Sequence, residues 1–477
     1  MRKKGSVTVF LTLILSLLLS LICASIESVR MASARTQILN GMDIGLYSLF
    51  GQYDKELLTD YDLFTLDGSR GGGQLNLAAV CDELEAYMNP VLKQNSQKLT
   101  LCQSGLTGYR LLTDQKGEAF YQQIVGYMQE TLGSQGIQLL LGRMSERQEK
   151  TAQADQSANQ VQSKGSIDRY DSEMNQASEK SQQAAEEAQV VPQAPPAKNP
   201  ITIMKRIMKR GVLELVLPGG NGLSTKEIEK GTLVSGRGLQ QGMEMPDGMT
   251  VENSYTSEVL FQQYLMEHLG SYAEPSSTGL AYQVEYIFGG KDSDEDNLKA
   301  VASKLLFIRE GVNFACLMAD NVKRSEAQAL ATAIASGFLV PPAAVIIEAA
   351  LILCWAFAES VLDVRELFAG GRIPLVKSSG DWQISLENLP DLMEGLDSMR
   401  RNDEKGMSYK DYLQVLVLTV SKEKKVMRAM DMIENTIREK GRKNFCMDSC
   451  IVALEAFADV KANKKKDFQV IRQYCYE

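Results

Sequence analysis

A single histidine limits the chemistry that this 477-residue chain can perform. Zinc sites of the HExxH or Cys2His2 type need at least two imidazoles, and a Ser-His-Asp arrangement needs one beside a nucleophile. His268 lies in the segment YLMEHL, among apolar residues at helical spacing, and nothing around it marks a nucleophile. We therefore expect a packed or exposed helix histidine, and a protein that is not an enzyme and has no catalytic residues.

An acidic run at 289–296, GGKDSDED, invites interpretation as a calcium-binding loop. The EF-hand pattern requires glycine at its sixth position and glutamate at its twelfth. Asn297 and Ser303 occupy those positions when the loop is counted from Asp292. Acidic residues at a helix start are favoured by the helix dipole, so the run predicts the beginning of a helix. We expect no metal site and no cofactor.

Eight cysteines are spread widely along the chain. Cys23 lies in an apolar N-terminal segment, and the other seven cannot all pair within one exported chain because their number is odd. Cys446 and Cys450 are four residues apart without histidine partners, which is a weak redox or metal signal. We expect most of these cysteines to act as small hydrophobic residues.

The charge balance argues against a nucleic-acid partner. The formal net charge is −9, whereas nucleic-acid binding depends on neutralising phosphates with clustered Lys and Arg. Apolar content of 44% and charged content of 23% are ordinary for globular proteins. The length leaves room for about two or three domains.

The N-terminal segment predicts a membrane anchor. The leader, residues 1–5, contains Arg2, Lys3 and Lys4, and residues 6–26 carry no charge. A helix of roughly 21 residues, rising about 1.5 Å per residue, matches the hydrocarbon core of a bilayer, which is about 30 Å thick. The basic leader favours the cytoplasmic side. We therefore predict a single-pass protein of the cell membrane with the bulk of the chain extracytoplasmic.

A cleaved secretory signal is the competing interpretation of this segment. It would need a shorter apolar region and an A-x-A-like exit, whereas residues 22–25 read ICAS. The apolar pattern also continues beyond the membrane at helical spacing through Met31, Ala34, Ile38 and Met42. The sequence thus predicts one long rod, apolar first and amphipathic afterwards.

Small residues within this rod have two expected roles. Ser16, Ser20 and Ala24 form a stripe at a spacing of four that would let apolar helices approach closely. Ordinary helix packing without a special purpose is an equally adequate explanation of the stripe. Gly41 and Gly45 are candidate soft points, positions at which the backbone of the rod could bend.

Beyond the anchor, composition divides the chain into three parts. Residues 27–144 contain the juxtamembrane rod and a first small lobe. Residues 145–200 are rich in Gln, Ala, Ser and Glu and end in prolines, which predicts a polar linker because too little apolar surface can be buried there. Residues 201–477 form the main helical exported domain with a C-terminal hairpin. The expected fold class is α+β, mostly α, with a small antiparallel sheet.

Two apolar stretches of the main domain need individual predictions. Residues 280–288 alternate Tyr, Val, Tyr and Phe with other residues, which predicts a strand. Residues 338–361 are nearly apolar enough for a second membrane span, but Pro341 and Pro342 break the start and Glu348 lies in the middle. A central core helix is the favoured interpretation, and a second span is the alternative.

The C-terminal part of the chain changes from a helical pattern of apolar residues to an alternating one. Ser408 and Asp411 have capping-box spacing and predict a long helix that continues to about residue 433. Residues 450–460 and 468–476 alternate, which predicts a terminal hairpin.

Six short motifs stand out along the chain: KGSVTVF at 4–10, IESVR at 26–30, YDKELL at 53–58, YDLF at 61–64, WAFAES at 355–360 and SYKDYL at 408–413. Together they resemble the TadE/TadG-like proteins associated with Tad (tight adherence, Flp) pili, in an otherwise uncharacterised membrane-anchored Gram-positive family. The resemblance implies a pseudopilin-like protein with a short basic leader, processed between Gly5 and Ser6. A cut there would place Phe10 where prepilins usually carry glutamate.

The function implied is therefore structural. By resemblance, the chain is a non-catalytic, membrane-anchored exported component of a Tad-like pilus or a related secretion or assembly apparatus. Its partners would be the membrane and pilus or secretion-apparatus proteins, without nucleic acid. The alternative is a membrane-anchored extracytoplasmic ligand-binding or sensor module with no filament.

Overall fold

The chain folds into two compact units, seen in a computed structural model. Unit 1 combines Met1–Tyr127, Gly231–Glu252 and Ile437–Glu477, and unit 2 combines Met128–Lys230 and Asn253–Thr436. The residues that the structure describes are 3–93, 99–163, 170, 172, 175–176, 179, 200–217, 222–243, 245, 254–337, 343–395, 406–462 and 466–476. The fold is α+β and mostly helical, as predicted.

Unit 1 is a small antiparallel sheet with helices packed on it. Its helices are α1 (Lys3–Phe50), α2 (Lys55–Tyr61) and α3 (Leu77–Lys93). Its strands are β1 (Leu66–Asp67), β2 (Leu99–Leu111), β5 (Cys450–Ala462) and β6 (Lys466–Cys475). β5 pairs antiparallel with each of the other three. The β5–β6 hairpin confirms the C-terminal prediction, whereas β2 was not predicted.

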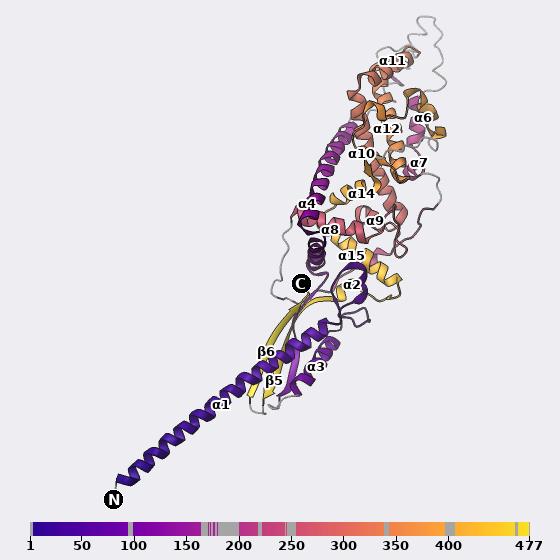
Figure 1. Cartoon of the computed structure of the whole chain (residues 1–477). Coiled ribbons are helices and arrows are strands. Elements are labelled where there is room, and N and C mark those ends of the chain that lie inside the picture. Colours follow the sequence, from indigo (N-terminus) through magenta and orange to yellow (C-terminus); the bar gives the residue numbers. More distant parts are fainter. Residues whose placement is uncertain are drawn as a thin grey trace. The chain divides into compact units, whose positions relative to one another are not determined.

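The core of unit 1 is built on the second half of α1, which lies beside α3 and the β5–β6 hairpin (Figure 1). Buried residues of α1 recur at helical spacing and meet buried residues of α3 and β5. They are Ala34, Ile38, Met42, Leu46 and Leu49 of α1, with Val80, Leu84 and Met88 of α3 and Leu454 and Ala456 of β5.

Gly41 and Gly45 are contact points between helices rather than the expected soft points. A Cβ atom built at Gly45 would lie 2.6 Å from Cγ of Met88, and one at Gly41 would lie 3.2 Å from Cδ2 of Leu92. The absent side chains let α3 approach α1 closely. α1 continues as one helix through both positions.

Unit 2 is a bundle of helices with one short ladder. Its helices are α6 (Pro200–Met208), α7 (Val212–Val216), α8 (Tyr255–His268), α9 (Gln283–Gly289), α10 (Asp294–Ala319), α11 (Asn321–Gly337), α12 (Ala344–Phe368), α13 (Leu392–Gly395) and α14 (Tyr409–Leu418). β3 (Arg372–Ile373) and β4 (Met407–Ser408) form the ladder. The long helices α4 (Asp114–Ser163) and α15 (Lys422–Glu439) each contribute residues to both units.

α12 is the central helix of unit 2. It packs against α10, α11, α6 and α7. The helix has the length and composition of a membrane span, but 78% of its most apolar window is buried inside the protein. This burial favours the core-helix interpretation of 338–361. The two prolines at its expected start lie outside the described residues.

Serine side chains cap three helices of unit 2. The side chains of Ser254, Ser293 and Ser408 accept backbone N–H groups at the first turns of α8, α10 and α14. Ser408 and Asp411 form the expected capping box. The helix expected to continue to about residue 433 is instead two helices, α14 and α15, which are separated at 419–421.

The strand expected at 280–288 is wrong, because Gln283–Gly289 form helix α9. The apolar alternation failed as a signal because this segment is buried on all sides. Gln283 and Glu285, which the alternation would place on a solvent face, are as buried as Val284 and Tyr286. In the expected polar linker, α4 extends as far as Ser163, and the proline-rich stretch 190–196 lies outside the described residues.

Candidate functional site

The first half of α1 is an uncovered apolar surface. Large side chains in this part are exposed on all sides of the helix, among them Phe10 at 63% and Leu17 at 68%. None of its most apolar window is buried, and the helix is long and apolar enough to cross a membrane. Exposing so much contiguous apolar surface to water is unfavourable. The segment therefore fits membrane anchoring.

The residues singled out within α1 occupy two places. Gly5 and Ser6 belong to its first turns, and Met1 and Arg2 of the leader lie outside the described residues. Ser16, Ser20 and Ala24 lie on the exposed surface. The hydroxyl of Ser16 donates to the carbonyl of Leu13 at 2.8 Å, and that of Ser20 donates to the carbonyl of Leu17 at 3.2 Å. Both hydroxyls are thus satisfied within the helix, as an apolar environment requires.

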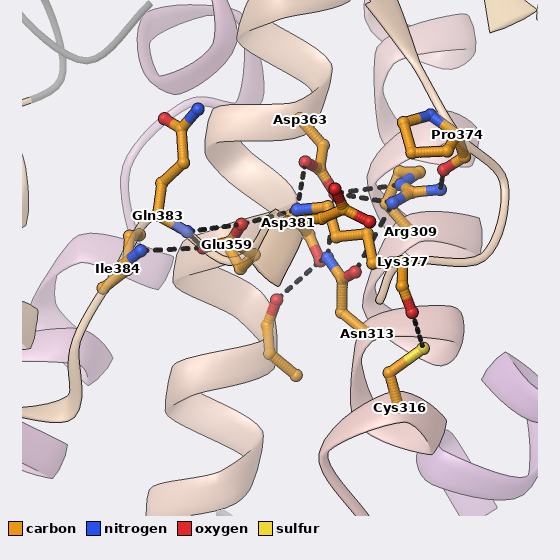
Figure 2. A network of polar contacts seen from close by, with 12 residues as sticks. Arg309, Asn313, Cys316, Glu359, Asp363, Pro374, Lys377, Asp381, Gln383 and Ile384 are labelled. Carbon is orange, nitrogen blue, oxygen red and sulfur yellow. Dashed lines mark hydrogen bonds and ion pairs between the residues drawn. The ribbon is translucent and has the colours of Figure 1, made fainter. Parts of the chain in front are cut away.

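A second site, in unit 2, is a buried network of charged groups between α10 and α12 (Figure 2). The guanidinium of Arg309 donates to Oδ2 of Asp363 from Nε at 3.0 Å and from Nη2 at 2.8 Å. The side-chain amide of Asn313 donates to the same oxygen at 3.0 Å and to the hydroxyl of Ser360 at 2.9 Å. Arg309 is fully buried and Asp363 is 2% exposed. Two neighbouring helices are therefore joined by an ion pair without solvent.

The segment that follows β3 completes this network. Lys377 donates from Nζ to Oε1 of Glu359 and lies as close to Oδ1 of Asp363, both at 2.5 Å. The carboxylate of Glu359 also accepts the backbone N–H groups of Gln383 and Ile384 at 3.0–3.3 Å. Segment 374–384 is in this way tied to α12 through side-chain and backbone groups.

The charges in the network compensate one another. Burial by itself would raise the pKa of Asp363, but the Arg309 and Lys377 cations outweigh it and keep that pKa below its ordinary value. Two carboxylates, those of Glu359 and Asp363, face two cations in a region closed to water. Such a network fixes the arrangement of the elements it joins, since breaking one member would leave a buried charge unpaired. We interpret it as a structural clamp.

The clamp was not predicted from the sequence. Its members come from α10, α12 and the segment after β3, and their separations along the chain carry no motif. One signal was available: Glu359 and Asp363 are acids four residues apart in an apolar stretch of α12. Acids at such positions call for buried partners.

The motifs considered for chemistry occupy ordinary structural positions. His268 ends α8, where its ring stacks on Tyr264 with centroids 4.0 Å apart. Asp294 of the acidic run accepts the backbone N–H groups of Ala281 and Tyr282 and the hydroxyl of Ser224. Cys23, Cys81, Cys102, Cys316, Cys354 and Cys450 are free thiols. Within the described ranges, no three His, Cys, Asp or Glu side chains gather closely enough to hold a metal ion.

These features define a class of protein: a mostly helical α+β chain with an N-terminal apolar helix suited to membrane anchoring. The chain belongs to a family of unknown function, DUF5702, whose model matches residues 192–462, more than half of the sequence. The matched range contains the whole clamp and leaves α1 outside. No curated protein and no solved structure matches the chain.

Proposed function

We propose that this protein is a non-catalytic, membrane-anchored exported component of a Tad-like pilus or a related secretion or assembly apparatus. The observation that carries the proposal is the division of α1 into two halves. Its first half is uncovered and apolar, and its second half forms the core of unit 1. One helix therefore offers its apolar surface either to lipid or to similar helices, while its other half is fixed in a folded body.

Two further observations support an assembly role. The motifs at 4–10 and 26–30 resemble the start of pseudopilin-like proteins. The stripe of Ser16, Ser20 and Ala24 presents small side chains whose hydroxyls are satisfied within the helix, so a neighbouring helix could pack there without desolvating an unpaired donor. The bulk of the chain lies on the extracytoplasmic side in this proposal, with α1 as a single span.

The proposal is tested by mild detergent extraction of the full chain from its native membrane, followed by mass spectrometry. We expect complexes with small proteins that themselves have a basic leader and an apolar N-terminal helix, and a new N-terminus at Ser6. The variant Ser16→Leu/Ser20→Leu should stay in the membrane and lose those partners. Leu18→Phe, which enlarges a different face of α1, should keep them. Recovery of the unmodified chain as a monomer without such partners would overturn the proposal.

A further inference from the structure

Unit 2 contains an open cavity of about 500 Å³ that has no role in the proposed assembly. One wall is a face of α4 and the other is the segment after β3, together with Gly406 and the start of β4. The lining residues are Arg143, Glu146, Arg147, Lys150, Pro374, Leu375, Val376, Gly406 and Met407. The volume is in the range of sites that hold small organic molecules.

The α4 wall is rich in positive charge. Its four charged residues are spaced i, i+3, i+4 and i+7, so they share one face of the helix. Three are cations and one is a carboxylate. Lys150 pairs with Glu146 at 2.5 Å, and Arg147 pairs with Asp411 at 2.8 Å. Both Arg143 and Lys150 are exposed at the cavity. The wall thus offers hydrogen-bond donors with a net positive charge.

The opposite wall is apolar and rigid. The guanidinium of Arg309 donates from Nη1 to the carbonyl of Pro374 at 3.0 Å and to that of Leu375 at 2.9 Å. Because Arg309 is the centre of the buried clamp, this wall is held by the same network that joins α10 to α12. A preformed wall lowers the entropy lost when a ligand binds.

We propose that this cavity binds a small organic oxyanion, a carboxylate or phosphate carried on an apolar body. Arginine and lysine donors form charge-assisted hydrogen bonds with the oxygens of such groups. The side chains of Leu375, Val376 and Met407 would contact the apolar body. Glu146 disfavours a ligand that carries several negative charges close together, so one oxyanion group is the best match.

The test uses the full chain in neutral detergent micelles and isothermal titration calorimetry. The soluble probes are inorganic phosphate, hexyl phosphate and hexanoate, and the lipid probe is vesicles of phosphatidylglycerol against phosphatidylcholine. We expect hexyl phosphate or hexanoate to bind more tightly than inorganic phosphate. Arg143→Gln/Lys150→Gln should weaken that binding by about tenfold or more, since charge-assisted hydrogen bonds are lost.

The matched control is Lys299→Gln/Lys424→Gln, which removes two exposed cations of unit 2 that lie outside the cavity. The control should bind as the parent does. Binding confined to phosphatidylglycerol vesicles, and lost only in the cavity variant, would identify a lipid headgroup as the source of the oxyanion. Equal weakening in both variants, or no binding of any probe, would overturn the proposal. Because both cavity substitutions are at exposed side chains, the thermal midpoint should stay unchanged.

Discussion

Two helices of this protein satisfy the same length and composition criteria for a membrane span, yet their surroundings differ completely. In α1, no part of the most apolar segment is buried inside the protein. In α12, 78% of the corresponding segment is buried. α12 carries Glu359 and Asp363, and both find buried cations. Within residues 7–26 of α1, hydroxyl side chains such as those of Thr12 and Ser16 donate to carbonyls of the same helix.

The comparison shows that the polar residues within an apolar helix indicate whether protein or lipid surrounds it. A helix surrounded by protein can carry acids, because neighbouring elements supply cations and N–H donors. A helix surrounded by lipid can carry only polar groups that it satisfies itself. The type of polar residue within an apolar stretch is therefore a better indicator than hydropathy of whether the helix lies in a protein core or in a membrane.

The largest expected effect comes from breaking the clamp around α12. Arg309→Met leaves Asp363 buried with less positive charge around it, and removing one partner of a buried pair costs about 3–5 kcal/mol. The free energy of unfolding should fall by that amount in denaturant titration. Arg210→Met removes an exposed cation paired with Glu214 one turn away, and it should cost less than about 0.5 kcal/mol. A similar loss in both variants would contradict the assignment of α12 to the protein core.

A charge placed on each helix tests the comparison directly. Leu15→Arg puts a cation in the middle of the exposed half of α1, where membrane insertion would cost about 3 kcal/mol. Val345→Arg puts one on the most exposed part of α12, where Val345 is 73% exposed, and it should be nearly neutral. The measurement is the fraction of protein recovered with membranes after alkaline washing. Loss of membrane association with Val345→Arg would indicate that α12 also contacts lipid.

A buried acid elsewhere in unit 2 gives the smallest of the three effects, and it depends on pH. Burial raises the pKa of Glu285 to about 7, although the N–H of Tyr272 and the hydroxyl of Tyr409 both donate to its Oε1. At a pH between its unfolded pKa and this raised pKa, Glu285 therefore gains its proton on folding, unlike Asp363 of α12, whose pKa the Arg309 and Lys377 cations keep below its ordinary value. Its contribution to stability is complete below the unfolded pKa of about 4.3 and is lost as pH rises through about 7.

Between about pH 5 and pH 7 the free energy of unfolding should fall by about 2–3 kcal/mol through this group, since each pKa unit corresponds to about 1.4 kcal/mol. Glu285→Gln keeps a neutral hydrogen-bonding side chain and should reduce the slope in that range by the share of Glu285, while Glu310, whose pKa burial also raises to about 7, keeps its own share. The comparison is made by denaturant titration of both proteins at several pH values. An unchanged slope in Glu285→Gln would show that Glu285 is not responsible.

Local signals in the sequence predicted much of the fold. The apolar run of α1, the capping box of Ser408 and Asp411, and the terminal hairpin all depend on neighbouring residues. β2 was missed because it is mostly half-exposed, contains Gly105 and Gly108, and pairs with β5 some 350 residues later, for example Gly105 with Phe457. Such long-range pairing leaves little local pattern.

The candidate sites also differ in whether they could be predicted from the sequence. The uncovered half of α1 was visible in composition alone. The clamp and the cavity were not, because Arg309, Asp363 and Lys377 become neighbours only through the packing of α10, α12 and the segment after β3. The cavity also combines α4 with residues more than 200 positions later.

The continuity of α1 has a mechanical consequence. Tight contacts at Gly41 and Gly45 fix the second half of the helix to α3, and the helix runs without interruption from Lys3 to Phe50. The apolar end of α1 is therefore joined by continuous helix to the segment that packs on α3 and the β5–β6 hairpin, so a force applied at that end acts on these elements through a single helix.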